Sequence, residues 1–164
     1  MLASIWRMLG SPIHWRILWL RHDKFMLGVS GVMLNEAGEV LLLQHTFWQK
    51  GSWGLPSGYI EKSETLEAGL QREIYEETQL RVEIERLLRT VSGYRLRLEM
   101  TYQGHIVGPA EPHLDPREVL AAQFFPLDQL PDGLLPSHRE VIGLVRQQRL
   151  DVVDVAAEMV EKEP

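Results

Sequence analysis

Cysteine is absent from the 164 residues of this chain, which excludes disulfides, thiolate nucleophiles and cysteine-based zinc sites. A basic excess is also absent. The formal charge is −6, whereas non-specific binding to a nucleic-acid duplex needs basic surface to neutralise the phosphates. No apolar run approaches the roughly 20 residues that span a bilayer, so no transmembrane segment is predicted. These absences favour a cytoplasmic protein that does not bind nucleic-acid duplexes.

The composition that is present is ordinary for a globular domain, with 45% hydrophobic and 24% charged residues. A chain of this length suits one domain with a substantial core. We expect an aromatic-rich arm at residues 1–25, a single domain at residues 26–150 and a helical tail at residues 151–164. No internal repeat or low-complexity segment interrupts this division.

The expected arm contains Trp6, Trp15 and Trp19 among leucines, isoleucines and arginines, but Gly10 and Pro12 interrupt it. This pattern fits neither a signal peptide nor a spanning helix. The segment can cover the domain core, form a homodimer interface, or lie on a membrane surface as an amphipathic segment. Packing against the core or against a second subunit is the favoured interpretation.

Alternating apolar residues predict the strands of a sheet. The predicted strands are Leu27–Leu34, Glu39–His45, Leu80–Ile84, Tyr94–Met100 and Val119–Leu127, with a short one at Trp53–Pro56. The run Asn35–Gly38 suits a hairpin turn, because glycine tolerates a positive φ. A break near Ser92 and Gly93 separates the two central strands, and residues 101–107 extend the second of these or add another.

Two stretches have helical periodicity, residues 65–78 and residues 137–150. Ser63 or Thr65 is the candidate N-cap of the first, and Ser137 is the candidate N-cap of the second. The buried face of the first helix is defined by apolar residues at every fourth position, Leu66, Leu70 and Ile74. Two further features are expected, a helical turn at residues 128–130 and either a second helix or a frayed tail at residues 152–160.

Acidic residues are concentrated in the stretch GYIEKSETLEAGLQREIYEETQL, residues 58–80. Glu73, Glu76 and Glu77 follow helical spacing, so the predicted helix lines up three carboxylates along one side. Such a cluster repels itself unless a cation is bound. Oxygen ligands in this number suit Mg²⁺ or Mn²⁺, which keep several waters and reach for substrate phosphates. The sequence therefore predicts metal-assisted chemistry on phosphate.

The same stretch resembles the signature of the Nudix hydrolases, also called MutT-like, G-x5-E-x7-R-E-U-x-E-E-x-G-U, where U is a bulky aliphatic residue. Eight of its nine defined positions match. The exception is Gln79, which stands where the family has a glycine that ends the helix. The left-handed cap conformation penalises a Cβ by roughly 1 to 2 kcal/mol, so we expect a folding cost and no loss of metal binding.

The resemblance covers roughly Met26 to Gln148 and implies an α/β fold, an α/β/α sandwich with a central mixed β-sheet. It also implies ligands for Mg²⁺ or Mn²⁺. Glu73 and Glu77 are the best of these, and Ser57 offers its backbone carbonyl. Glu76 is implied as a further ligand or as the residue that orients the attacking water.

Other implied roles belong to residues around these ligands. Arg72 is expected to pair with the helix carboxylates and hold them for catalysis, and Glu64 belongs to that scaffold or to the outer metal shell. Glu118 is expected to add a carboxylate that acts as metal ligand or general base. Asp115 and Glu111 are alternatives for that base, and only geometry can choose among them.

Substrate contacts are predicted from side-chain chemistry alone, and each candidate is more often an ordinary surface or core residue. Candidates for phosphate contacts are His45, Lys50, Arg95 and Arg97. Candidates for stacking on a base are Phe47, Trp48, Tyr94 and Tyr102. Three histidines without metal-like spacing are interpreted as surface residues, His105, His113 and His138.

The leading interpretation is a hydrolase that cleaves the pyrophosphate bond of a nucleoside diphosphate linked to another moiety. Nucleoside triphosphates are preferred over sugar nucleotides, other dinucleotides and a short capped RNA. The alternative is a non-catalytic Nudix-fold protein that binds or senses a nucleotide. An isoprenoid diphosphate isomerase is disfavoured, because such enzymes use a catalytic cysteine and this chain has none.

Overall fold

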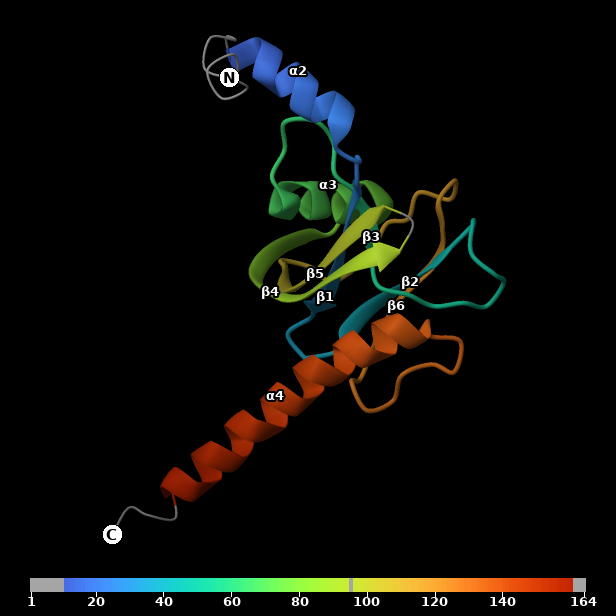
Figure 1. Cartoon of the computed structure of the whole chain (residues 1–164). Helices are drawn as coiled ribbons and strands as arrows, with labels where there is room; N and C mark the ends of the chain where they lie inside the picture. Colours follow the sequence, from blue (N-terminus) through green and yellow to red (C-terminus); the bar gives the residue numbers. More distant parts are fainter. Residues whose placement is uncertain (1–10, 95, 161–164) are drawn as a thin grey trace.

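The computed structural model describes residues 11–94 and 96–160 of the chain (Figure 1). Three helices and six strands follow one another in these residues. Their order is α2 (Ser11–Arg21), β1 (Met26–Leu34), β2 (Val40–His45), β3 (Ser57–Tyr59), α3 (Leu66–Thr78), β4 (Arg81–Tyr94), β5 (Arg97–Val107), β6 (Val119–Phe125) and α4 (Pro136–Val160). No helix within the described residues is long and apolar enough to cross a membrane.

The strands form one mixed sheet of six strands in the order β4-β5-β1-β2-β6, with β3 paired to β1. Strands β1 and β5 are parallel along their whole length, and every other pair is antiparallel. The free edge of β1 is divided between two partners, because Gly28–Ser30 pairs with β3 whereas Leu34 pairs with β2. The sequence prediction of a mixed sheet is confirmed.

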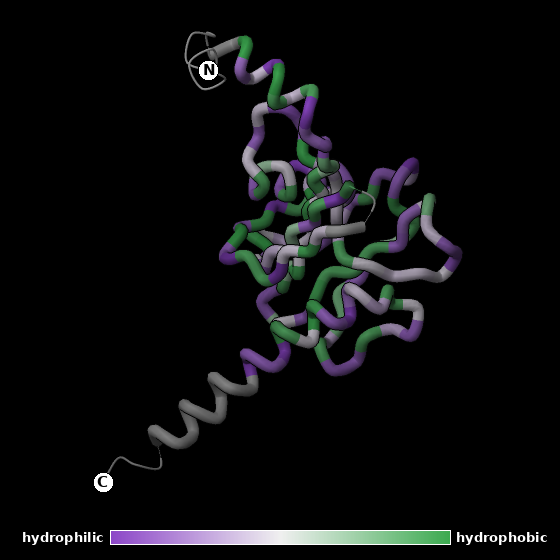
Figure 2. The backbone as a smooth tube through the Cα atoms, in the orientation of Figure 1, coloured by the Kyte–Doolittle hydropathy of each residue, from purple (hydrophilic) through white to green (hydrophobic). Residues whose placement is uncertain are grey.

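Helices cover both faces of the sheet, which makes the predicted α/β/α sandwich (Figure 1). Side chains alternate along β1, so Val29 and Met33 pack with α3 residues in one core cluster. Val32 and Leu34 pack with Ile142 of α4 in the other cluster. Burial on both faces explains the long apolar runs of the inner strands, which Figure 2 shows as hydrophobic segments at the centre of the domain.

Helix α3 is defined by a cap at each end. Thr65 is extended at φ −81° and accepts a hydrogen bond from the Ala68 N–H at 3.2 Å, so it is the N-cap of the two candidates. Gln79 adopts the left-handed conformation at φ 59°, and its N–H donates to the Tyr75 carbonyl at 2.8 Å. The predicted helix stop is therefore present with a glutamine in the position that favours glycine.

The hairpin turn at Asn35–Gly38 is confirmed, with Gly38 at φ 78° and the Gly38 N–H bonded to the Asn35 carbonyl. The turn predicted near Ser92 and Gly93 is wrong. Strand β4 continues to Tyr94, and the pairing register shifts between Ser92 and Tyr94. Glycine here accommodates an irregularity within the strand rather than a chain reversal.

Three other predicted boundaries are also wrong. Of residues 53–56, only Trp53 and Gly54 pair, as isolated bridges, and the strand is β3 just beyond them. A non-helical turn closed by Gln129 N–H to Pro126 O replaces the helical turn at residues 128–130. Helix α4 begins at Pro136, which suits the first helical position because proline lacks an N–H, so Ser137 is not its cap. The same helix runs without a break to Val160, so the second helix is a continuation of the first.

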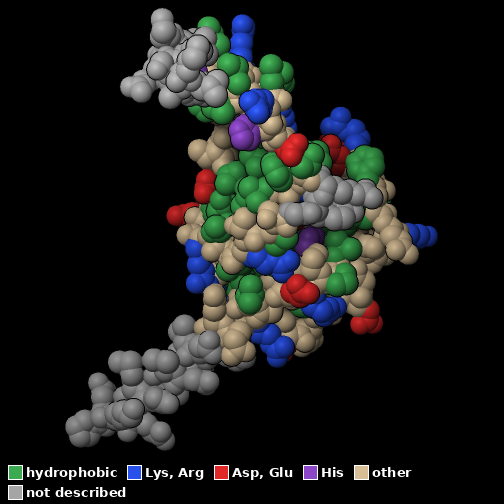
Figure 3. All heavy atoms as spheres, in the orientation of Figure 1, with side chains coloured by type: hydrophobic (Ala, Val, Ile, Leu, Met, Phe, Trp, Pro, Cys, Tyr) green, Lys and Arg blue, Asp and Glu red, His purple; other side chains and the backbone are tan. Residues whose placement is uncertain are grey.

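Helix α2 of the arm stands away from the domain (Figure 1). Trp15 is 71% exposed and Trp19 is 65% exposed, and apolar side chains lie on the surface at this end of the molecule (Figure 3). The prediction that the arm covers the core is therefore wrong for residues 11–21. Trp6 lies outside the described residues, and dimerisation through the arm stays a prediction.

Candidate active site

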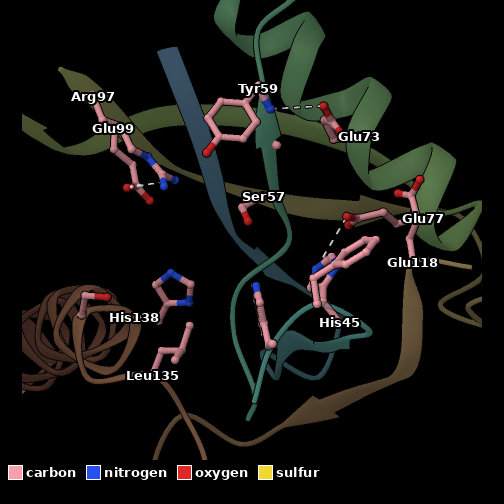
Figure 4. Close-up of a pocket in the computed structure, with 14 residues that line it drawn as sticks. His45, Ser57, Tyr59, Glu73, Glu77, Arg97, Glu99, Glu118, Leu135 and His138 are labelled. Carbon is pink, nitrogen blue, oxygen red and sulfur yellow. Dashed lines mark hydrogen bonds and ion pairs between the residues drawn. The ribbon is translucent and has the colours of Figure 1, made fainter. Parts of the chain in front are cut away.

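A cavity of about 470 Å³ opens where β3, the end of β2, helix α3 and the start of α4 meet (Figure 4). Acidic, basic and aromatic groups share its lining. The lining residues are His45, Phe47, Trp48, Ser57, Gly58, Tyr59, Glu73, Glu77, Arg97, Glu99, Glu118, Leu135, Ser137 and His138. Another hollow is lined by Trp15, Trp19, Leu20 and Arg16, with no acidic group among its described lining residues. The chemistry predicted from the sequence therefore belongs to the first cavity.

Four carboxylates line this cavity, and three of them lie on one side of it, Glu73 and Glu77 from successive turns of α3 and Glu118 from the residue before β6 (Figure 4). The fourth, Glu99, lies beside Arg97 on the other side. Glu77 is 3% exposed, and its Oε2 has no hydrogen-bond partner among the described residues. Burial, followed by the negative charges of Glu73, Glu118 and Glu76, raises the pKa of Glu77 to about 8. Burial also raises the pKa of Glu73, although Arg72 opposes that shift.

These groups fit a divalent cation. A buried carboxylate oxygen without a partner is costly, and mutual repulsion among Glu73, Glu77 and Glu118 increases that cost. Mg²⁺ or Mn²⁺ takes oxygen ligands from a few carboxylates and completes its shell with water. Across the described ranges, no group of three or more acidic or histidine side chains is arranged so that it could hold a metal ion by itself. The cavity therefore offers suitable donors, with water and substrate needed to complete the coordination.

Arg72 connects the carboxylates of this region. Its Nη2 lies 2.8 Å from Glu64 Oε1, and its Nη1 lies 3.1 Å from Glu73 Oε1 and 3.2 Å from Glu76 Oε2. Its Nη2 also donates to the Tyr59 carbonyl at 3.1 Å. The hydrogen bonds from Arg72 lower the pKa of Glu64, and those to Glu64 raise the pKa of Arg72. The planar guanidinium thus joins α3 to β3 and orients Glu73.

Gly58 provides the space that Glu73 occupies. A Cβ at Gly58 would lie 2.0 Å from the Glu73 Cδ, which no real contact allows. The neighbouring Tyr59 N–H donates to Glu73 Oε1 at 3.2 Å. The carboxylate therefore crosses the backbone of β3 closely, and only glycine fits beneath it.

Glu76 and Glu64 do not line the cavity. The Glu76 side chain is 58% exposed and is paired with Arg72. Glu64 accepts hydrogen bonds from Arg72 and from the Glu61 N–H. The structure thus places Glu64 in the predicted scaffold, whereas the metal or water contact predicted for Glu76 stays a prediction.

Geometry distinguishes the three candidates for the additional carboxylate. Only Glu118 lines the cavity. Asp115 is paired with Arg117, whose Nε donates to Oδ1 at 3.0 Å, and these bonds lower the pKa of Asp115 to about 2. Glu111 is exposed outside the cavity. Asp115 is therefore a poor proton acceptor, and Glu118 is in the better position.

His45 reaches the carboxylates through an irregularity in β2. The pairing of β2 with β6 shifts between Gln44 and His45, and such a bulge redirects the side chain. The His45 Nε2 lies 3.6 Å from Glu77 Oε1 (Figure 4). Its ring packs against that of Trp48 at a tilt of 51°, with centroids 4.3 Å apart. Burial lowers the pKa of His45, so this histidine is a neutral neighbour of Glu77.

The wall opposite Glu73, Glu77 and Glu118 carries a cation, Arg97, together with Glu99. The Arg97 guanidinium lies 5.3 Å from the Tyr59 ring centroid, and its Nη2 is 3.3 Å from Glu99 Oε2. The Arg97 Nε is buried without a hydrogen-bond partner in the described part of the chain. Of the predicted phosphate contacts, Arg97 and His45 line the cavity, whereas Lys50 does not and Arg95 lies outside the described residues.

Of the residues predicted to stack on a base, some line the cavity and others do not. Trp48 and Phe47 line the cavity. Tyr102 is buried in the core, so its proposed stacking role is wrong. The side chain of Tyr94 lies outside the described residues.

His138, interpreted from the sequence as a surface residue, is a cavity residue instead. Its Nδ1 accepts the Leu55 N–H at 2.9 Å, and its ring makes an edge contact with Trp48 at 6.4 Å. Burial, with smaller effects of Arg97 and Arg89, lowers the pKa of His138 to about 4. Leu55 and His138 are 83 positions apart, so local spacing contained no signal for this contact. Tyr59 and Glu99 also line the cavity and were not predicted, although Tyr59 directly follows Gly58 and Glu99 is two residues from Arg97.

Comparisons with known proteins identify the family of the chain and agree with its fold. The family model described as the NUDIX domain matches residues 24–145. A MutT-like protein of Streptomyces ambofaciens is 41% identical over 61 residues, which is 37% of this chain and 38% of that protein. The 8-oxo-dGDP phosphatase of Homo sapiens is 48% identical over 61 residues, which is 37% of this chain and 19% of that protein.

Among solved structures, a MutT NUDIX hydrolase from Burkholderia pseudomallei superposes with a TM-score of 0.64 at 27% identity. That match covers 75% of this chain and 99% of the other. The chain spans less than two-fifths of the length of these two curated relatives, 38% and 19%.

Proposed function

The chain belongs to the Nudix family, and from this premise we propose that it is a pyrophosphohydrolase that depends on a divalent cation. The expected substrate is a nucleoside diphosphate linked to another moiety, with a nucleoside triphosphate preferred. The observation that carries the proposal is the meeting of Glu73, Glu77 and Glu118 in one cavity that also holds Arg97. Carboxylates of this set would bind the metal, and Arg97 on the opposite wall would bind the phosphate oxygens of the substrate.

We assign the metal, Mg²⁺ or Mn²⁺, to Glu73 and Glu77, with the Ser57 carbonyl as a further donor. When bound, the cation would neutralise phosphate oxygens and favour the deprotonation of a water molecule. The unpartnered Oε2 of Glu77 supports this assignment. Arg72 holds Glu73 in position through the 3.1 Å contact and is a positioning residue in this scheme.

Glu118 is the proposed general base. It would accept a proton from the attacking water at a carboxylate oxygen, as the water oxygen bonds to phosphorus and the bridging oxygen departs with the leaving phosphate. Arg97 would bind oxygens of the phosphate chain from the opposite wall, since its Nε lacks a partner within the described residues. The exposed ring of Phe47 and the ring of Trp48 offer apolar surface to a base.

The nucleotide preference is supported by the relatives, one of which is named an 8-oxo-dGDP phosphatase. A cavity of about 470 Å³ is also in the range of small-molecule sites, roughly 300–1,000 Å³. Sugar nucleotides stay as alternatives, because the far wall of the cavity combines polar and aromatic groups.

The test is to incubate the wild type and Glu77→Gln with Mg²⁺ and a panel of nucleotides, and to identify the products by mass. The wild type should release a nucleoside monophosphate, and Glu77→Gln should be slower by at least about tenfold. Glu36→Gln is the control, because Glu36 is exposed in the hairpin between β1 and β2. A wild type that cleaves nothing contradicts the enzyme and leaves nucleotide binding as the function.

A further inference from the structure

His138 occupies a part of the cavity that the proposed reaction does not use. It lies in the first turn of α4, on the side away from Glu77 and Glu118, and its ring faces the hollow (Figure 4). Between it and the acids lies Trp48, whose ring centroid is 4.3 Å from that of His45 and 6.4 Å from that of His138. A ligand that fills the cavity from the acids to this wall would therefore contact His138.

The hydrogen bond from the backbone fixes which nitrogen of His138 carries the proton. The Leu55 N–H donates to Nδ1 at 2.9 Å, so Nδ1 is an acceptor. A neutral imidazole has one N–H, which must then be on Nε2. No acceptor for Nε2 is found in the described part of the protein, so this donor is available to a ligand.

Gly54 leaves the space that the rings of Trp48 and His138 occupy. A Cβ at Gly54 would lie 2.4 Å from Cη2 of Trp48 and 2.9 Å from Nδ1 of His138. Gly54 itself is held by reciprocal backbone hydrogen bonds with Leu43, at 2.8 and 2.9 Å. The imidazole of His138 is thus held by its backbone position in α4 and by the hydrogen bond from the Leu55 N–H.

The aromatic and apolar side chains beside His138 suit a nucleobase. Trp48 and Leu135 lie beside it in the lining, and Phe47, 85% exposed, is in the same cavity. The phosphate chain already has the acids for its metal and Arg97 for its oxygens. An aromatic pocket with one fixed neutral donor matches a nucleobase that carries a carbonyl oxygen.

We propose that His138 is a specificity-determining residue whose Nε2–H donates to a carbonyl oxygen of the substrate's nucleobase. The site then favours a 6-oxopurine over a 6-aminopurine, because the amino group would present a second donor to Nε2–H. This inference rests on the proposed function for its substrate class and goes beyond it in naming what the base must offer.

The experiment compares kcat/KM for GTP and for ATP in Mg²⁺. The wild type should prefer GTP by at least about tenfold, since a site built to donate a hydrogen bond rejects a substrate without the acceptor. His138→Phe should bring the ratio to within about threefold of one. His138→Gln should retain part of the preference, because its amide can accept from Leu55 N–H and donate into the cavity. His105→Phe is the matched control, since His105 pairs with Glu83 and Glu85 on the surface.

A wild-type ratio near one, or a ratio unchanged in both His138 variants, overturns the proposal. NMR of the wild type decides the matter if the variants fail to fold. Long-range ¹H–¹⁵N spectra should show Nε2 protonated, and the β,γ-imido analogue of GTP should shift that signal more than the ATP analogue does. A proton on Nδ1, or equal shifts, would refute the role. If no nucleotide is cleaved, the proposed function fails, while the NMR comparison still decides the role of His138.

Discussion

The His45 Nε2 lies 3.6 Å from the Glu77 Oε1, and both side chains are almost completely buried. Neither the His45 Nε2 nor the other oxygen of Glu77 has a hydrogen-bond partner in the described part of the chain. Burial lowers the pKa of His45 and raises the pKa of Glu77 to about 8, so the pair is neutral at physiological pH without a cation. A bound cation would reverse the preference of Glu77 for its proton.

Glu77→Gln should stabilise the protein in the absence of divalent cations at pH 8. The folded-state pKa of Glu77 is raised from 4.5 to about 8, so its contribution is fully present below pH 4.5 and is lost as pH rises through 8. The variant should gain about 1 to 3 kcal/mol in free energy of unfolding at pH 8 and almost nothing at pH 4.5. Urea unfolding in EDTA at both pH values measures this. If Glu77→Gln is less stable than the wild type at pH 8, the Glu77 carboxylate is not buried without a hydrogen-bond partner, as it is among the described residues.

Arg72→Lys should reduce kcat by at least about tenfold, because a single ammonium cannot replace the guanidinium contacts to Glu64, Glu73 and Glu76. The free energy of unfolding should fall by only about 1 kcal/mol, since these groups are partly exposed. Arg89→Lys is the control, because Arg89 pairs with exposed Glu140. Steady-state kinetics measure kcat of both variants. An equal fall in kcat in both would contradict the positioning role of Arg72.

Gly58→Ala should displace Glu73, because the added Cβ would lie 2.0 Å from the Cδ of that residue. Activity and Mn²⁺ affinity should each fall by about tenfold or more. Gly143→Ala in α4 is the matched control, since no atom lies within 4 Å of its added Cβ. That control should keep full activity and gain about 0.5 to 1 kcal/mol of stability from helix propensity. Full activity in Gly58→Ala would show that Glu73 does not depend on its present position.

His138 should stay neutral down to about pH 4 in the folded protein. Burial is the main cause, and the charges of Arg97 and Arg89 add to it. The unfolded state takes up this proton near pH 6.5, so the contribution to stability is present above pH 6.5 and is lost as pH falls towards 4. His138→Gln should weaken this loss, and an NMR titration of the ring gives the pKa directly. A midpoint above 6 would contradict the buried environment.

Gln79→Gly should stabilise the fold by about 1 kcal/mol, because Gln79 holds the left-handed conformation at φ 59°. The gain is reduced by loss of the hydrogen bond from the Gln79 side chain to the Tyr75 carbonyl at 3.1 Å. Turnover should not change, since Gln79 does not line the cavity. Thermal unfolding and kinetics of the two proteins measure both effects.

The acids of the site could be predicted because their spacing is local. Glu73 and Glu77 lie one helical turn apart, and a helix with clear caps presents them together. The strands followed from alternation, but the break near Ser92 was placed wrongly, because glycine also occurs at irregularities inside strands. Local patterns thus predicted that the helix and strands exist, but they predicted the ends of the strands less well.

The far wall could not be predicted in the same way. Arg97 reaches the cavity through the parallel pairing of β5 with β1, and His138 reaches it through Leu55. Both placements depend on contacts between segments distant in sequence. His138 has no metal-like spacing, so from the sequence it resembled a surface residue. Only the packing of α4 against the loop before β3 brings it into the cavity.

The most direct measurement is the rate at which the wild type releases nucleoside monophosphate from GTP, first with Mg²⁺ and then with excess EDTA. The account predicts turnover with Mg²⁺, loss of at least about a hundredfold with EDTA, and recovery when Mg²⁺ or Mn²⁺ is restored. Equal rates with and without the cation, or no cleavage of GTP or any other nucleotide under either condition, would contradict a metal-dependent pyrophosphohydrolase.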